Sequence, residues 1–168
     1  MVRNRMTGGL YDPDNIALET SLGYYLTKAR QVLVERMDRA LAPFDLTAQQ
    51  IGVILLLSRG HARTPFELSR KMSYDSGSMT RMLDRLERKG LVARSRSEQD
   101  RRMIELTLTA RGAEAAAALP SLIATALNAQ LAGFSADELA TLTSLLQRFI
   151  GNGPGLADGC PRPDEADD

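Results

Sequence analysis

Two arginines, Arg81 and Arg85, stand four residues apart and therefore share one face if the segment around them is helical. A guanidinium group can donate two parallel hydrogen bonds to a phosphate, or to the O6 and N7 atoms of a guanine. Small polar residues precede them, namely Ser76, Ser78 and Thr80, and these let a helix lie close to DNA. The pattern predicts a helix that reads base edges in the major groove, because a helix fits that groove.

A second group of cations lies in residues 91–96 and 103–108, two short apolar segments around a polar turn that predict a β-hairpin. Arg94 and Arg96 fall on the first strand, whereas Arg101 and Arg102 fall at the tip. An arginine on a protruding loop can enter the narrow minor groove of DNA, where the potential is strongly negative. We expect these four arginines to contact DNA.

The distribution of charge along the chain agrees with a nucleic-acid partner. The chain has 168 residues, with 21 Lys and Arg against 21 Asp and Glu, so its net charge is zero. Residues 61–111 nevertheless hold 12 of the basic and 7 of the acidic residues, a net charge of +5, which leaves −5 for the remainder. Such asymmetry is a weak sign of DNA binding. The alternative is a solvated face on which arginines only pair with nearby acids.

Helical and strand patterns supply the elements that must position these side chains. Capping boxes at residues 47–50, 64–67 and 135–138 mark three helix starts, and Asp14 or Asn15 can cap an earlier one. The spacing of apolar residues predicts helices over residues 16–41, 48–58, 65–72, 76–89, 110–132 and 136–150. Two short helices followed by a hairpin make a winged helix-turn-helix, so we predict a mainly α fold with a small β-hairpin wing.

The outer helices of this pattern are too long and too apolar for a lone winged domain, which indicates a second copy of the chain as partner. A twofold dimer presents two recognition helices about 34 Å apart, one turn of DNA. The predicted parts are a flexible arm (1–13), a dimerisation helix (14–45), the winged helix-turn-helix (46–109), C-terminal dimerisation helices (110–151) and a disordered acidic tail (152–168).

One long stretch of the chain is similar to a known family. The sequence DSGSMTRMLDRLERKGLV at residues 75–92, DRR at 100–102 and LTLTARG at 106–112 resembles the MarR family of bacterial transcription regulators, and LTAQQ at 46–50 is similar to that family's entry into its second helix. The resemblance implies a homodimer that binds a palindromic operator, usually as a repressor, and a small phenolic or aromatic-acid ligand that weakens DNA binding.

The resemblance also assigns roles by position. It implies groove contacts for Arg81 and Arg85, entry of Arg102 into the minor groove, and an orienting role for Asp100. A carboxylate that holds one edge of a guanidinium group leaves the other edge directed at DNA. Arg101, in the middle of the motif, would contact a phosphate.

Ligands of similar proteins lie between the dimer helices and the winged domain. An aromatic acid needs an apolar slot with one cation or hydroxyl. Tyr25 lies on the apolar stripe of its helix, where a core position is the alternative, and His61 has the alternative of an ordinary loop histidine. The candidates for this effector site are Tyr24, Tyr25, Lys28, Arg30, Arg59 and His61.

The composition excludes several other classes of protein. One Cys and one His cannot form a structural zinc site or an intrachain disulfide, and we expect neither a metal nor a cofactor. The sequence has no Gly-rich phosphate loop, His-based triad or paired-carboxylate motif, so we expect no enzyme. No apolar run approaches the roughly 18 residues of a membrane span, which favours a cytoplasmic protein. The resemblance to the MarR family implies a bacterial protein associated with the nucleoid. The alternatives are a winged-helix module that binds protein and a regulator that no ligand releases from DNA.

Overall fold

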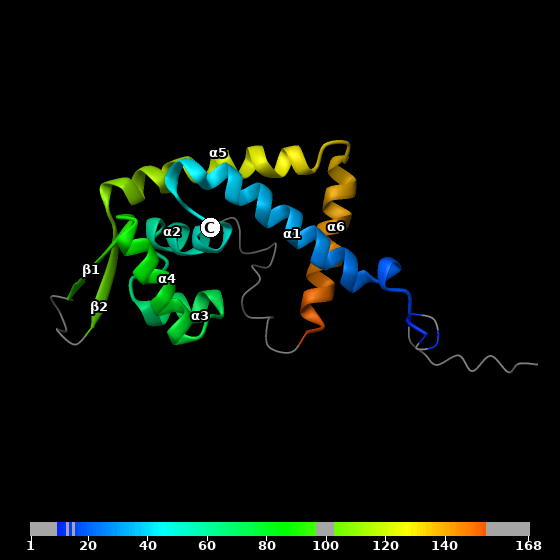
Figure 1. Cartoon of the computed structure of the whole chain (residues 1–168), viewed down its shortest axis with the longest axis horizontal. Helices are drawn as coiled ribbons and strands as arrows, with labels where there is room; N and C mark the ends of the chain where they lie inside the picture. Colours follow the sequence, from blue (N-terminus) through cyan, green and yellow to red (C-terminus); the bar gives the residue numbers. More distant parts are fainter. Residues whose placement is uncertain (1–9, 13, 15, 97–102, 154–168) are drawn as a thin grey trace, which may run out of the picture.

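The computed structural model describes residues 10–12, 14, 16–96 and 103–153 (Figure 1). Helices α1 and α5 pack against each other, a winged unit lies at one end of this pair, and α6 descends from the far end of α5. The prediction of a mainly α fold with one small antiparallel hairpin is confirmed. The elements are α1 (Leu22–Leu41), α2 (Ile51–Ser58), α3 (Pro65–Met72), α4 (Ser76–Arg88), β1 (Val92–Arg96), β2 (Ile104–Leu108), α5 (Ala110–Gln130) and α6 (Ala136–Gly151).

The first long helix begins later than predicted. The expected start at residue 16, with Asp14 or Asn15 as cap, is wrong: α1 begins at Leu22 and is capped by Ser21, whose hydroxyl accepts a hydrogen bond from the Tyr24 amide at 3.2 Å. Ser21 has extended backbone angles, and a separate 3₁₀ turn (Leu18–Thr20) precedes it. A serine that offers its side chain to a free amide favours a helix start over a helix interior.

Local signals fix the short helices as predicted. In the Thr64–Glu67 capping box the Thr64 hydroxyl accepts from the Glu67 amide and the Glu67 carboxylate accepts from the Thr64 amide, which starts α3. A 3₁₀ turn (Ala48–Gln50) leads into α2, and the Gln50 side chain accepts from the Thr47 amide. Past the ends of α2 and α4 stand Gly60 and Gly90, both with φ +68°, a conformation that favours glycine.

The wing is a regular antiparallel pair in which Val92 lies opposite Leu108 and Arg96 lies opposite Ile104. A third segment, which the sequence pattern did not predict, joins its edge: the Leu106 amide donates to the Arg63 carbonyl at 2.7 Å. This contact ties the loop between α2 and α3 to β2, so the hairpin is anchored to the helices on its inner side.

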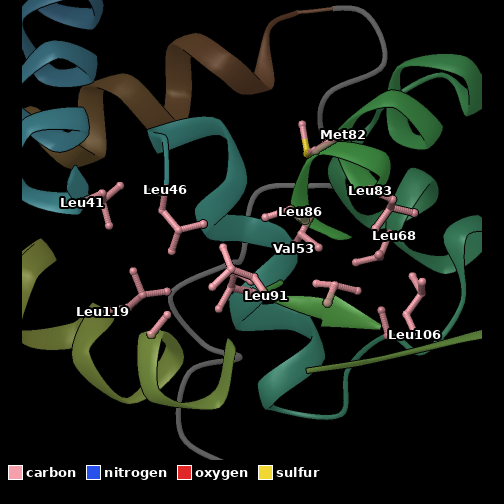
Figure 2. Close-up of a cluster of buried hydrophobic side chains, with 14 of the residues drawn as sticks. Leu41, Leu46, Val53, Leu68, Met82, Leu83, Leu86, Leu91, Leu106 and Leu119 are labelled. Carbon is pink, nitrogen blue, oxygen red and sulfur yellow. The ribbon is translucent and has the colours of Figure 1, made fainter. Parts of the chain in front are cut away.

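The core lies where α1 ends, between α2, α4, the base of the wing and α5 (Figure 2). The nearly all-apolar helix α2 is central, as predicted, and its Val53 and Ile54 side chains are fully buried. The other fully buried large side chains are Leu41, Leu68, Met79, Met82, Leu83, Leu86, Leu91, Val92 and Leu119. Helix α4 and the wing therefore share one core, which holds them in a fixed relation.

Within the part of the chain that the structure describes, two apolar faces remain uncovered. Helix α6 has no buried residue, although Leu142, Leu145 and Leu146 line one side of it. They form, with the first half of α1, a groove of about 600 Å³. Tyr25 belongs to this groove and is 58% exposed, so the alternative that Tyr25 lies in the core of its own chain is wrong.

No single helix in the described ranges is long and apolar enough to cross a membrane, although the bent pair of Leu22–Phe44 and Ala48–Ser58 reaches that length and composition. The predicted arm (1–13) and acidic tail (152–168) fall mostly outside the described residues. Within the arm, the Tyr11 hydroxyl accepts a hydrogen bond from the Leu22 amide at 2.7 Å, so this part of the arm fastens to the start of α1.

Candidate DNA-binding interface

Helix α4 separates its residues into an apolar and a polar face. Met79, Met82, Leu83 and Leu86 are buried against the core. The opposite face carries the predicted DNA-reading residues: Ser76, Thr80, Arg81 and Arg85 are exposed and Ser78 is half-buried. The structure thus brings all five of these predicted residues onto the outer side of one helix.

The first turn of α4 is organised by its cap. The Asp75 carboxylate accepts a hydrogen bond from the Ser78 amide at 2.8 Å, and the Arg81 guanidinium donates to the Ser78 hydroxyl at 3.2 Å. Hydrogen bonds from Ser78 to the carboxylate, and secondarily the positive charge of Arg81, lower the pKa of Asp75 below its ordinary value of 3.8. This chain of contacts holds Arg81 over the exposed start of the helix.

The depressed pKa makes the cap sensitive to acid. A group of this kind stabilises the folded state fully above its unfolded pKa, and the contribution is lost as the pH falls through the lower folded pKa. Asparagine caps a helix nearly as well as aspartate but does not titrate. We expect Asp75→Asn to melt like the wild type at pH 7 and to lose less stability than the wild type below about pH 4. Thermal melts across that range provide the measurement, and identical acid sensitivity of the two proteins would contradict the role of the carboxylate.

Arg94 is held inside the winged unit. Its guanidinium lies 2.7 Å from the Asp84 carboxylate and 3.4 Å from the Glu87 carboxylate, and its side chain is only 26% exposed. Arg94 thereby joins β1 to the middle of α4. Arg96, which the sequence also predicts to face DNA, is exposed at the last residue of β1.

The predicted roles of Asp100, Arg101 and Arg102 lie outside the described residues. Their position in the chain is framed by the last pair of the hairpin, Arg96 and Ile104. Both of these residues are exposed, so the described ends of the two strands lie outside the core.

A set of anchors at the carboxyl end of α4 was not predicted from the sequence pattern. The Lys89 ammonium group donates to the Asp45 carbonyl and, at 3.2 Å, to the Gln50 side chain, which is 3% exposed. On the other side, Arg111 donates to the Lys89 carbonyl at 2.6 Å and Thr109 donates to the Gly90 carbonyl at 2.6 Å. The end of α4 is thus tied to the loop after α1 and to the start of α5.

The candidate effector residues fall into separate places. On α1, the rings of Tyr24 and Tyr25 meet edge to face with centroids 5.6 Å apart, and the Lys28 ammonium group lies 5.9 Å from the centre of the Tyr24 ring. Arg59 and His61 follow α2 and are exposed. Among the described residues, no hydrogen bond, ion pair or ring contact joins these two to the tyrosines, and Arg30 is exposed on α1.

Known proteins share the sequence of this winged unit. A model of the MarR family matches residues 46–104, the span from the loop before α2 to the first residue of β2. The multiple antibiotic resistance protein MarR of Escherichia coli K12 is 35% identical over 130 residues, which are 77% of this chain and 90% of that protein. The similarity therefore extends beyond the winged unit to the flanking helices.

Two solved structures that contain DNA resemble more than three quarters of this chain. The transcriptional repressor CouR bound to a 23-mer DNA duplex has a TM-score of 0.69 at 33% identity, covering 79% of this chain and 94% of CouR. A mutant E. coli MarR complexed with operator DNA has a TM-score of 0.67 at 34% identity, covering 77% and 93%. The chain belongs to the MarR family of DNA-binding transcriptional regulators.

Proposed function

We propose that the protein is a homodimeric repressor that binds a palindromic operator and is released from it by a small aromatic ligand. The observation that carries the DNA-binding part is the outer face of α4, where exposed Ser76, Thr80, Arg81 and Arg85 stand on a helix whose other face is locked into the core. A helix held in this way can enter the major groove as a rigid body.

The predicted DNA-binding residues have different roles in binding the operator. Arg81 and Arg85 donate to base edges, and the small residues Ser76, Ser78 and Thr80 permit close approach and bond to bases or phosphates. Because Arg94 already binds two carboxylates, we assign it to positioning α4 against the wing, in place of a direct contact. In the wing, Arg96 and Arg101 contact phosphates, and Arg102, oriented by Asp100, enters the minor groove.

A second copy of the chain is needed for this arrangement. The exposed apolar residues of α6 and the first half of α1 are too numerous for a solvated surface, and burying them against a partner is favourable by about 25 cal/mol per Å² of apolar area. A twofold dimer through these helices doubles α4, so that two half-sites of one operator are bound together.

The ligand-binding part rests on α1. Tyr24 and Lys28 combine an aromatic surface with a cation, which is the pair of groups that an aromatic acid requires. Tyr25, Arg30, Arg59 and His61 are the further candidates around a site between the dimer helices and the winged unit. The ligand would act by binding more tightly to a spacing of the two α4 helices that does not fit DNA.

One relative supports repression as the sign of regulation. CouR, which has the same fold at 33% identity, is described as a transcriptional repressor, and its structure holds a DNA duplex. A dimer bound across a promoter blocks polymerase without any further activity, so repression is the simplest outcome of operator binding by a protein of this form.

Replacing Arg81 tests the role of α4. A bidentate contact to a base contributes about 1–3 kcal/mol, and the dimer makes it twice, so Arg81→Ala should weaken operator binding at least about thirtyfold. The operator is first isolated by selection from fragments of the source genome, and affinity is then measured by fluorescence anisotropy. Arg39→Ala removes an exposed α1 cation that pairs with Glu35 and should leave affinity unchanged. Equal operator affinity of Arg81→Ala and the wild type would contradict the proposal.

A further inference from the structure

A hollow of about 450 Å³ opens at the carboxyl end of α4, where this helix meets the loop after α1 and the start of α5. Its lining consists of four cations and one acid, so it carries a net charge of +3 in a chain whose total is zero. The lining residues are Arg85, Arg88, Lys89, Arg111 and Asp45. This is a local concentration of positive charge beside the proposed DNA-reading face.

The single acid does not neutralise the hollow. The Asp45 carboxylate lies 3.6 Å from the Lys89 ammonium group, which also donates to the Asp45 carbonyl and the Gln50 side chain. The charges of the Asp45 and Lys89 side chains therefore neutralise each other. Among the described residues, no ion pair engages the remaining three cations, Arg85, Arg88 and Arg111.

The arginines keep donors available for a ligand. Arg111 uses one N–H on the Lys89 carbonyl, and Arg88 uses its Nε–H on the Asp84 carbonyl at 3.3 Å. A guanidinium group has five N–H donors, so each of these two arginines keeps donors that no hydrogen bond within the described residues uses. Favourable interaction with the helix dipole accounts for cations in the last turn of α4. Arg111 reaches the same hollow from α5, where it spends one N–H on the carboxyl end of α4.

We propose that this hollow is a binding site for a phosphate group. Guanidinium groups bind phosphate through pairs of charge-assisted hydrogen bonds, and here Arg88 and Arg111 converge from two helices, with the positive charge of Arg85 beside them. The phosphate group has two sources, the backbone of bound DNA and a free phosphate compound. The first source rests on the proposed function, whereas the second does not.

Titration with inorganic pyrophosphate tests the site without DNA. Calorimetry on the full-length protein in chloride buffer should show one saturable site per protomer. Arg88→Gln and Arg111→Gln should each weaken binding at least about tenfold, because each removes a charge-assisted pair of hydrogen bonds. Arg39→Gln, which removes the same charge from the exposed surface of α1, should bind pyrophosphate like the wild type. In the described part of the chain, Arg88 bonds only within its own helix, so Arg88→Gln keeps the fold even where Arg111→Gln does not.

The salt dependence of operator binding distinguishes the two sources. A plot of log affinity against log salt has a negative slope. If a backbone phosphate occupies the hollow, Arg88→Gln makes this slope less steep by about 0.9 for each phosphate that is no longer neutralised, whereas Arg39→Gln leaves the slope unchanged. Pyrophosphate binding that depends on Arg88, or this change in slope, supports the site. Absence of both effects overturns it. Failure of the proposed function gives a different result from failure of the phosphate site. The wild type would then bind no operator, and the pyrophosphate titration would still test whether the hollow binds a phosphate group.

Discussion

Gly112→Ala is expected to destabilise the protein by about 3 kcal/mol or more, a large part of the total stability of a domain. A Cβ atom at Gly112 would lie 1.9 Å from the backbone carbonyl oxygen of Leu91. Neither group can move freely, because the Thr109 amide donates to this same carbonyl and Gly112 is in the first turn of α5. Thermal or urea melts at a fixed protomer concentration measure the loss of stability.

The sign of this effect separates packing from helix propensity. Alanine is favoured over glycine in a helix by about 1 kcal/mol, so propensity alone predicts that Gly112→Ala stabilises the protein. Gly23→Ala on α1 is the matched control, because its Cβ would meet no atom within 4 Å. We expect the control to leave stability equal or slightly higher. A neutral or stabilising Gly112→Ala would show that the junction between the wing and α5 is not tightly packed.

Placing charge on α6 is expected to separate the dimer. The double substitution Leu142→Asp and Leu146→Asp puts two carboxylates into the apolar groove between α6 and α1, and burying unpaired charge is costly. The variant should be monomeric at micromolar concentration by light scattering. Operator affinity should fall at least about a hundredfold, because two half-sites are no longer bound through one linked unit.

A control on the same helix tests whether the face matters. Ser144 is an exposed polar residue of α6 that does not line the groove, so Ser144→Asp should remain dimeric and bind the operator like the wild type. A dimeric double variant, or a wild type that is itself monomeric in this range, would show that the uncovered face has another purpose.

Much of the fold could be predicted because its signals are local. Each capping box lies within four residues, and the glycines at positions 60 and 90 stand where a helix must stop. The start of α1 was missed for a local reason too: Asp14 and Ser21 are both good caps, and apolar spacing continues across Ser21. Only the extended backbone at Ser21 decides between them.

The candidate site could be predicted only in part, since α4 carries its signal within 13 residues whereas other contacts span the chain. Arg94 looks like a free cation in the sequence, and its pairing with Asp84 requires β1 to lie against α4. Lys89 donates a hydrogen bond to the carbonyl of Asp45, which lies 44 residues earlier in the sequence. The spacing of residues along one helix is fixed by helix geometry, whereas contacts between residues far apart in the sequence depend on how several elements pack.

Footprinting on an operator selected from the source genome would show whether two copies of α4 bind successive turns of one duplex. We expect protection of two half-sites whose centres lie about 10–10.5 base pairs apart, with affinity that falls steeply as salt rises. Protection of a single site, or no selected fragment even in dilute buffer, would contradict binding by a symmetric pair of recognition helices.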